Sequence, residues 1–246
     1  MNKLENDFLI IETSKAGAEL TRIFSKALNN EILWNGDSKY LGRHSPILFP
    51  IVGRLKDNET IIDNKVYNMT QHGFARDMNF ELINTTDNSI TYKLTSSEET
   101  KEVYPYDFNL FIIYTINNEK INVKWKIENI DNKEIYFSIG AHPAFNISSS
   151  KNLKDYYLEF ECRDNVEKIR LENSYYTRPK KIENLYILNL ILLYVLILIT
   201  PPLNQNLKSP RDIPSLLAAS SLVRLFSLTH KLSLSKNSSK LYTSFV

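Results

Sequence analysis

The chain of 246 residues, 43% hydrophobic and 24% charged, is long enough to bury a sizeable core as one large domain or two small ones. Its formal net charge is +2, and residues 1–183 carry 24 basic and 27 acidic side chains, which argues against the concentrated basic face that nucleic-acid binding needs. A single cysteine, Cys162, excludes an intrachain disulfide, and residues 1–8 lack the apolar core of an export signal, so we expect a cytoplasmic protein.

Short apolar segments separated by turn residues fill the first part of the chain. Residues 8–12, 19–24 and 31–34 are predicted strands, and residues 15–18 and 35–37 are predicted turns. Turns spaced about eight to twelve residues apart are typical of β-sandwiches and barrels. The chain is therefore expected to begin as a series of short strands.

Three hairpins are predicted further along the chain. They comprise residues 59–62 with 65–67 around Asp63-Asn64, residues 80–94 with a tip at 86–88, and residues 108–116 with 120–128 around 117–119. Residues 121–128 alternate strictly between apolar and polar side chains, which predicts a half-buried strand. The first 180 residues show no internal repeat and no amphipathic helix. The predicted class is therefore all-β with antiparallel sheets.

The apolar residues 45–54 contain two prolines, Pro46 and Pro50. A proline cannot donate a hydrogen bond to a β-ladder, so this segment is expected at a sheet edge or in a loop. Gly53 precedes Arg54. We expect the chain to bend there and to project the Arg54 guanidinium.

The sequence Tyr-Phe-Ser-Ile-Gly-Ala-His-Pro-Ala-Phe at residues 136–145 predicts a strand that ends at a histidine. The residue before a proline is restricted to extended geometry, so His142, which precedes Pro143, should point in a narrow range of directions. An ordinary imidazole titrates near pH ~6.5 and exchanges protons at cellular pH. His142 is therefore a candidate acid or base, the alternative being a histidine that packs at a strand terminus.

A second polar motif, Gln-His-Gly-Phe-Ala-Arg, occupies residues 71–76. Gly73 gives the backbone freedom directly after His72, and Arg76 lies four residues beyond the histidine. An amide, an imidazole and a guanidinium together form a donor-rich group suited to sugar hydroxyls or to an anion. The alternative is a solvated loop with a capping histidine.

The composition changes near residue 184, so we divide the chain into residues 1–183 and an anomalous tail, 184–246. Residues 185–199 are Leu, Ile, Tyr and Val apart from Asn189, and no glycine occurs beyond Gly140. Three interpretations stay open: a buried apolar segment, a membrane anchor, and a segment read in a shifted frame. We favour the last, because the tail lacks the turn residues that a β domain needs and the apolar run is shorter than the roughly 18 residues of a spanning helix.

The Gly53-Arg54 pair, the motif at 71–76 and Gly-Ala-His-Pro-Ala-Phe at 140–145 occur in an order that resembles the aldose 1-epimerase (galactose-mutarotase-like) family, particularly its shorter bacterial members. The resemblance covers about residues 4–181. It implies a large antiparallel β-sandwich with an open sugar cleft, here incomplete or irregular at its C-terminus. It also implies a small-molecule sugar as partner and neither a metal nor an organic cofactor.

The resemblance assigns roles to individual residues. It implies that His142 is the general acid that protonates the ring oxygen of a hexose while the α and β anomers interconvert. It implies that Arg54 and His72 bind the sugar. Related hexose-6-phosphate epimerases share a His-Gly-x-Ala-Arg pattern, so Arg54 and Arg76 together could bind a phosphate. We favour a free aldose.

The tail departs from the family pattern. Family members carry a glutamate base late in the chain, in a Glu-Pro-Trp-like context, whereas this sequence has no glutamate after Glu183. An upstream sugar-binding aspartate is unmatched as well, and Asp212 is the single acid of the tail. Loss of a general base should slow turnover by about 10²–10⁴-fold. A non-catalytic sugar-binding protein of the same fold is therefore the alternative hypothesis.

Overall fold

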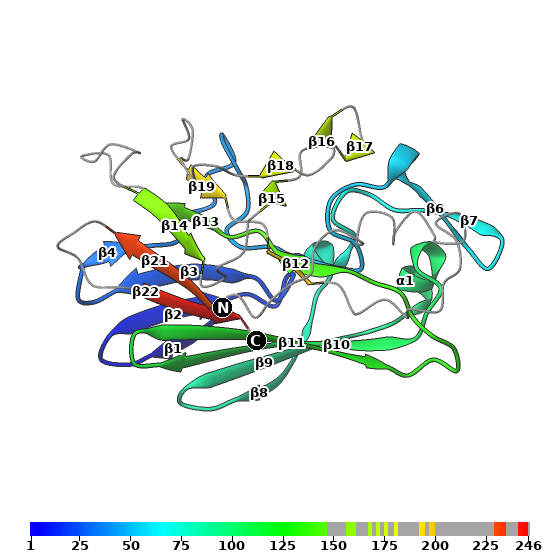
Figure 1. The fold of residues 1–246 in the computed structure, drawn as a ribbon. Helices are drawn as coiled ribbons and strands as arrows, with labels where there is room; N and C mark the ends of the chain where they lie inside the picture. The colour runs from blue at the N-terminus through cyan, green and yellow to red at the C-terminus, as the bar shows by residue number, and fades with distance from the viewer. Residues whose placement is uncertain are drawn as a thin grey trace.

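A computed structural model describes residues 1–146 completely and the backbone of short strands beyond them. These later strands are β14 (Tyr156–Phe160), β15 (Glu167–Lys168), β16 (Leu171–Glu172), β17 (Tyr175–Tyr176), β18 (Lys180–Lys181), β19 (Leu192–Tyr194), β20 (Ile197–Ile199), β21 (Thr229–Leu234) and β22 (Leu241–Phe245). The described part is built mostly of strands in antiparallel sheets (Figure 1), which confirms the predicted all-β class.

The chain begins with a four-stranded sheet in the order β1-β2-β3-β4. Its strands are β1 (Asn2–Glu5), β2 (Leu9–Thr13), β3 (Leu20–Ser25) and β4 (Asn30–Glu31). Every second side chain of β2 is buried, which is the alternation of a strand with one face on the core. The predicted strand at 31–34 is shorter than expected, because Leu33 leaves the sheet and forms an isolated bridge with Phe145.

A seven-stranded sheet has the order β14-β21-β22-β11-β10-β9-β8. Its central strands are β8 (Glu81–Thr85), β9 (Ser89–Thr95), β10 (Phe108–Asn117) and β11 (Lys120–Asn129). The pairing of β10 with β11 runs over ten residue pairs, from Phe108↔Asn129 to Asn117↔Lys120. The sequence analysis expected antiparallel sheets, and one pairing among the described strands differs, because β11 and β22 are parallel.

All three predicted hairpins are present. Strands β6 (Glu59–Ile62) and β7 (Lys65–Asn68) flank Asp63 and Asn64, whose φ angles of 49° and 63° match the two-residue turn that suits a twisted hairpin. This hairpin projects from one end of the molecule, beside the single α-helix of the described region (Figure 1). The other two hairpins are β8–β9 and β10–β11.

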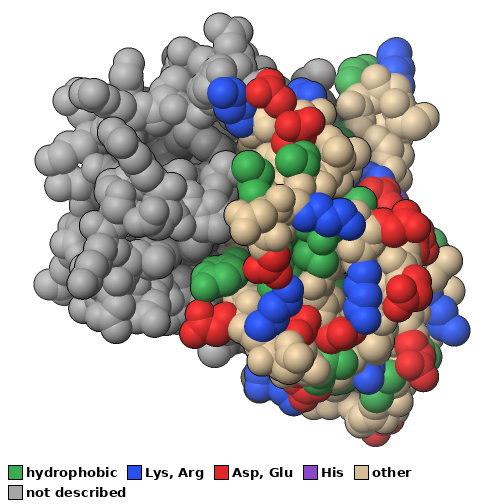
Figure 2. Space-filling model, turned by 90° about the vertical axis from the view of Figure 1, so that its right-hand side faces the viewer, with side chains coloured by type: hydrophobic (Ala, Val, Ile, Leu, Met, Phe, Trp, Pro, Cys, Tyr) green, Lys and Arg blue, Asp and Glu red, His purple; other side chains and the backbone are tan. Residues whose placement is uncertain are grey.

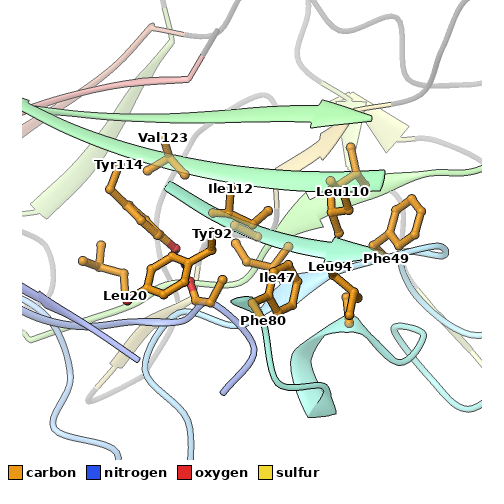
Figure 3. Close-up of a cluster of buried hydrophobic side chains, with 14 of the residues drawn as sticks. Leu20, Ile47, Phe49, Phe80, Tyr92, Leu94, Leu110, Ile112, Tyr114 and Val123 are labelled. Carbon is orange, nitrogen blue, oxygen red and sulfur yellow. Dashed lines mark hydrogen bonds between the residues drawn. The ribbon is translucent and has the colours of Figure 1, made fainter. Parts of the chain in front are cut away.

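The core lies between the two larger sheets and is lined by the buried faces of β9 and β10 (Figure 3). Two buried tyrosines add directed hydrogen bonds to this apolar contact. The Tyr114 hydroxyl donates to the Ala18 carbonyl at 2.7 Å, and the Tyr92 hydroxyl lies 2.8 Å from the Thr13 hydroxyl. Each bond joins a strand of the large sheet to the first twenty residues, so the sheets are fixed in their relative position.

Two local predictions were wrong. Helix α1 (Glu98–Val103) was not expected; it begins at Ser97, which forms a capping box with Thr100. The predicted strand before His142 is reduced to β12 (Ile139–Ala141). The Ser138 N–H donates to the Pro50 carbonyl. Pro50 has no N–H with which to form the second hydrogen bond of the pair, so the ladder does not extend toward Tyr136.

The tail contributes strands to the centre of the molecule. Strand β20 pairs with β12, and β19 pairs with β13 (Ala144–Asn146). The remaining residues of the apolar run, and the shifted-frame and membrane-anchor interpretations, lie outside the described residues and stay predictions. Within the described part of the chain, no helix has the length and hydrophobicity to cross a membrane.

Tyr114→Phe should lower the free energy of unfolding by about 1–2 kcal/mol, because it leaves the buried Ala18 carbonyl without its hydrogen-bond donor. Urea denaturation measures this change. Tyr40→Phe is the matched control, since Tyr40 is 59% exposed and its ring contact with Trp34 is kept; we expect a change within about 0.5 kcal/mol. Equal effects of both variants would contradict the proposed role of the hydroxyl.

Candidate functional site

The central segment, residues 44–53, lies beside the chain that carries His142. The His44 carbonyl accepts the Ala144 N–H at 2.9 Å, and the Pro46 carbonyl accepts the His142 N–H at 3.1 Å. Directly after Pro46, strand β5 (Ile47–Leu48) pairs with β12 as the edge of a three-stranded sheet, which confirms the edge position predicted from the prolines. His142 therefore follows the end of β12, as predicted, with its backbone fixed.

The central segment also holds the chain that carries His72. The Phe49 carbonyl accepts the N–H groups of Phe74 and Ala75, at 3.0 and 3.1 Å. His72 donates its backbone N–H to the Gly53 carbonyl at 2.7 Å, and the Gly53 N–H donates to His72 Nδ1 at 3.0 Å. The same ten residues thus position both histidines.

Gly73 makes this close approach possible. Its φ is +70°, and a Cβ atom at this position would lie 2.3 Å from the Phe49 carbonyl oxygen. His72 also has a positive φ, of 71°, so two successive residues adopt the left-handed conformation. A non-glycine residue is strained there, and the surrounding hydrogen bonds stabilise the His72 conformation.

The two histidine rings face each other. Their centroids are 5.9 Å apart and the rings are inclined by 77°, an edge-to-face arrangement. Both side chains are partly buried at the junction of the three segments. Two imidazoles in this arrangement can contact one small polar molecule from two directions.

Burial, together with the smaller effects of the charges of Arg76 and His142, lowers the pKa of His72 to about 4. Since Nδ1 accepts the Gly53 N–H, the neutral ring carries its proton on Nε2. Burial also lowers the pKa of His142, and Arg76 acts in the same direction. Both rings are therefore mainly neutral at pH 7.

Arg76 belongs to the same site. It lies in the short 3-10 helix η2 (Ala75–Asp77), and its Nη2 donates to the Gln71 carbonyl at 2.8 Å. Burial, followed by repulsion from Arg43, lowers the pKa of the Arg76 guanidinium. The structure brings His72, His142 and Arg76 together.

Arg54 follows Gly53, whose backbone contacts His72. The Arg54 side chain is exposed, and its Nε donates to Asn58 Oδ1 at 2.8 Å, in the 3-10 helix η1 (Lys56–Asn58). The Asn58 contact uses the Nε atom of the Arg54 guanidinium. The predicted role of Arg54 in sugar binding stays a prediction.

Glu19 is a residue that the sequence reasoning missed. Its carboxylate accepts the N–H groups of His44 and Ser45, at 2.7 and 2.8 Å, and fixes the start of the central segment. Glu19 lies more than twenty residues from this segment, so no local motif reveals the contact. In the described residues, no three His, Cys, Asp or Glu side chains gather as a metal site.

Gly73→Ala should lower the free energy of unfolding by at least about 2 kcal/mol, because the new Cβ would collide with the Phe49 carbonyl in a strained conformation. Chemical denaturation measures the loss. Gly42→Ala is the control: the atoms nearest a Cβ there lie at 3.7 Å, in Ser38, so we expect a change within about 0.5 kcal/mol. A Gly73→Ala variant as stable as the control would contradict the role of this glycine.

An NMR titration of the imidazole resonances should give a His72 pKa of about 4. The unfolded chain binds this proton near pH 6.5 and the folded chain only near pH 4, so the free energy of unfolding should decrease as the pH falls between these values. Urea denaturation over this range should give a shallower decrease for His72→Gln. A His72 resonance that titrates near 6.5 would contradict the buried, neutral ring.

The sequence and the fold were compared with those of known proteins. The sequence model of a family described as aldose 1-epimerase matches residues 2–185. Two LacX proteins of Lactococcus lactis subsp. lactis, one chromosomal and one from a plasmid, are 34% and 33% identical over 166 residues. These matches cover 64% of this chain and 55% of each relative, so the chain spans little more than half the length of these proteins.

Solved structures agree with the family match. A galactose mutarotase related enzyme from Lactobacillus acidophilus superimposes with a TM-score of 0.74 at 27% identity, over 97% of this chain and 75% of that one. A galactose mutarotase-like protein from Lactobacillus casei gives a TM-score of 0.68 at 28% identity, over 80% of this chain and 67% of that one. Given the family match over residues 2–185 and the shared β-sandwich, this chain belongs to the aldose 1-epimerase family.

Proposed function

We propose that this chain interconverts the α and β anomers of a free hexose by acid–base ring opening. The observation that supports this most directly is the His72–His142 pair, 5.9 Å apart and edge to face, with Arg76 beside it. These groups offer hydrogen-bond donors from several directions, which suits a sugar with many hydroxyl groups. The aldose 1-epimerase family, to which the chain belongs, supports mutarotation as the reaction of these residues.

The reaction needs a proton on the ring oxygen and the loss of one from the anomeric hydroxyl. The bond between C1 and the ring oxygen then breaks and gives the open-chain aldehyde. Rotation about the C1–C2 bond and closure on the other face yield the second anomer. We assign the proton donor to His142, while neutral His72, with its hydrogen on Nε2, and Arg76 donate hydrogen bonds to sugar oxygens. Arg54 is retained as a candidate contact at the edge of the site.

We assign no general base among the described residues. The late glutamate of the family is absent from the sequence, and Asp212 lies outside the described residues. We therefore expect slow turnover, about 10²–10⁴-fold below that of an enzyme with a positioned base. The same observation favours a second candidate, a non-catalytic sugar-binding protein. It predicts saturable hexose binding without any anomer exchange above that of buffer.

A hexose 6-phosphate is the less favoured substrate. A bidentate phosphate site needs two convergent guanidinium groups. Arg54 is bonded to Asn58, whereas Arg76 is bonded to the Gln71 carbonyl and paired with Asp77. Each guanidinium thus has its own partner within the protein, and on this ground we propose a free hexose as the substrate. The expected location is the cytoplasm.

His142→Ala should reduce the rate of anomer exchange by about 10²–10⁴-fold, because it removes the positioned acid. NMR saturation transfer between the anomeric protons of a free hexose measures the rate, with buffer alone as the baseline. His44→Gln is the control, since the His44 backbone, which the variant keeps, makes the contact with Ala144. Unchanged exchange in His142→Ala would remove the acid assignment.

The pH dependence tests the protonation state of the same residue. Burial keeps the His142 pKa below its usual 6.5, so the acid form declines about tenfold per pH unit at higher pH. Between pH 6.5 and 8, log kcat/KM should therefore fall with a slope of about −1. A rate that rises over this range would contradict a protonated His142 as the active form.

A further inference from the structure

A cluster of two arginines and an aspartate lies at η2, next to the histidine pair. Arg43 Nη1 donates to the Arg76 carbonyl at 3.2 Å, and Arg43 Nη2 forms an ion pair with the Asp77 carboxylate. The other Asp77 oxygen lies 3.6 Å from Arg76 Nε. The carboxylate thus lies between two guanidinium groups and offers one oxygen to each.

The backbone of η2 is fixed independently of these charges. The Ala75 N–H donates to the Phe49 carbonyl at 3.1 Å, and the Gly17 N–H donates to the Met78 carbonyl at 2.7 Å. Gly17 packs so closely that a Cβ atom there would lie 2.7 Å from the Arg76 carbonyl oxygen. The Arg76 side chain is held separately, by the Gln71 carbonyl at Nη2 and by the Asp77 carboxylate near Nε.

We propose that Arg43 is a positioning residue: by occupying one oxygen of Asp77, it keeps the Arg76 guanidinium directed toward His72 and His142. This inference rests on the proposed sugar site and adds Arg43 to it. Arg43 occupies one Asp77 oxygen and leaves one for Arg76. Without Arg43, the carboxylate is free to take the Arg76 guanidinium in the two-bond geometry that arginine and carboxylate favour. The Arg76 guanidinium would then turn toward Asp77 and away from the histidines.

Charge effects on the histidines make this testable without any enzyme assay. Arg76 contributes to the lowered pKa of both rings. Arg76→Gln should raise both values and sets the scale of the effect. Arg43→Gln should raise them by about half a unit, and Asp77→Asn should lower them, because it leaves the Arg76 charge uncompensated.

Arg43→Lys is the decisive variant. A lysine keeps the positive charge but cannot bridge the Arg76 carbonyl and Asp77 with a planar fork. If Arg43 acts by positioning, this variant should raise the histidine pKa values as Arg43→Gln does. If Arg43 acts only through its charge, or only stabilises the fold, Arg43→Lys should titrate like the parent protein, which would overturn the proposal.

The control is the ion pair of Arg22 with Glu12 and Glu31, which has similar exposure and lies in the first sheet. Arg22→Lys should leave both histidine titrations unchanged; a shift equal to that of Arg43→Lys would also overturn the proposal. In the exchange assay, Arg43→Lys should raise KM by about tenfold and change kcat by less than about twofold, as loss of a binding contact does. A parent protein without exchange would refute the proposed function, while the titrations would still decide the positioning role.

Discussion

The geometry of the site depends on one short stretch of chain that forms hydrogen bonds along both of its sides. The central segment accepts or donates bonds toward the His142 chain through His44 and Pro46, and toward the His72 chain through Phe49 and Gly53. Its prolines limit the regular ladder to two residue pairs, because a proline accepts a hydrogen bond but donates none. The strand that leads to His142 therefore leaves the ladder at this residue. The His142 side chain lies at the end of the sheet and not within a continuous ladder.

This segment is held by contacts of different kinds at its two ends. Glu19 accepts two successive N–H groups at the start, and His72 Nδ1 accepts the Gly53 N–H at the end. The turn that carries Glu19 is joined to the large sheet through the Tyr114 hydroxyl and Ala18. The core shown in Figure 3 thus supports the central segment through Tyr114 and the turn that carries Glu19.

Electrostatics in this site result from local placement and not from overall charge. On the face shown in Figure 2, lysines, arginines and acidic residues are interspersed. Near the histidines the balance differs, because the partly buried Arg76 carries a positive charge and Asp77 offsets it from the outer side. Neutral imidazoles next to a guanidinium are good hydrogen-bond donors.

The sequence alone determined the local elements, because turn residues and period-two alternation act over a few neighbours. The hairpin at Asp63-Asn64, the half-buried β11 and the position of His142 at a strand end before Pro143 all followed from such patterns. The two histidine motifs also pointed to the family.

Tertiary structure alone decided which side chains meet. Arg43 and Asp77 are 34 residues apart, and Glu19 and His44 are 25 apart, so no pattern along the chain links them. The sequence also left open whether Arg54 and Arg76 act together; in the fold Arg54 is bonded to Asn58, while the charge of Arg76 acts on both histidines. The physical reason is that a hydrogen bond or ion pair depends on the distance between folded segments, which only the packing of the sheets fixes.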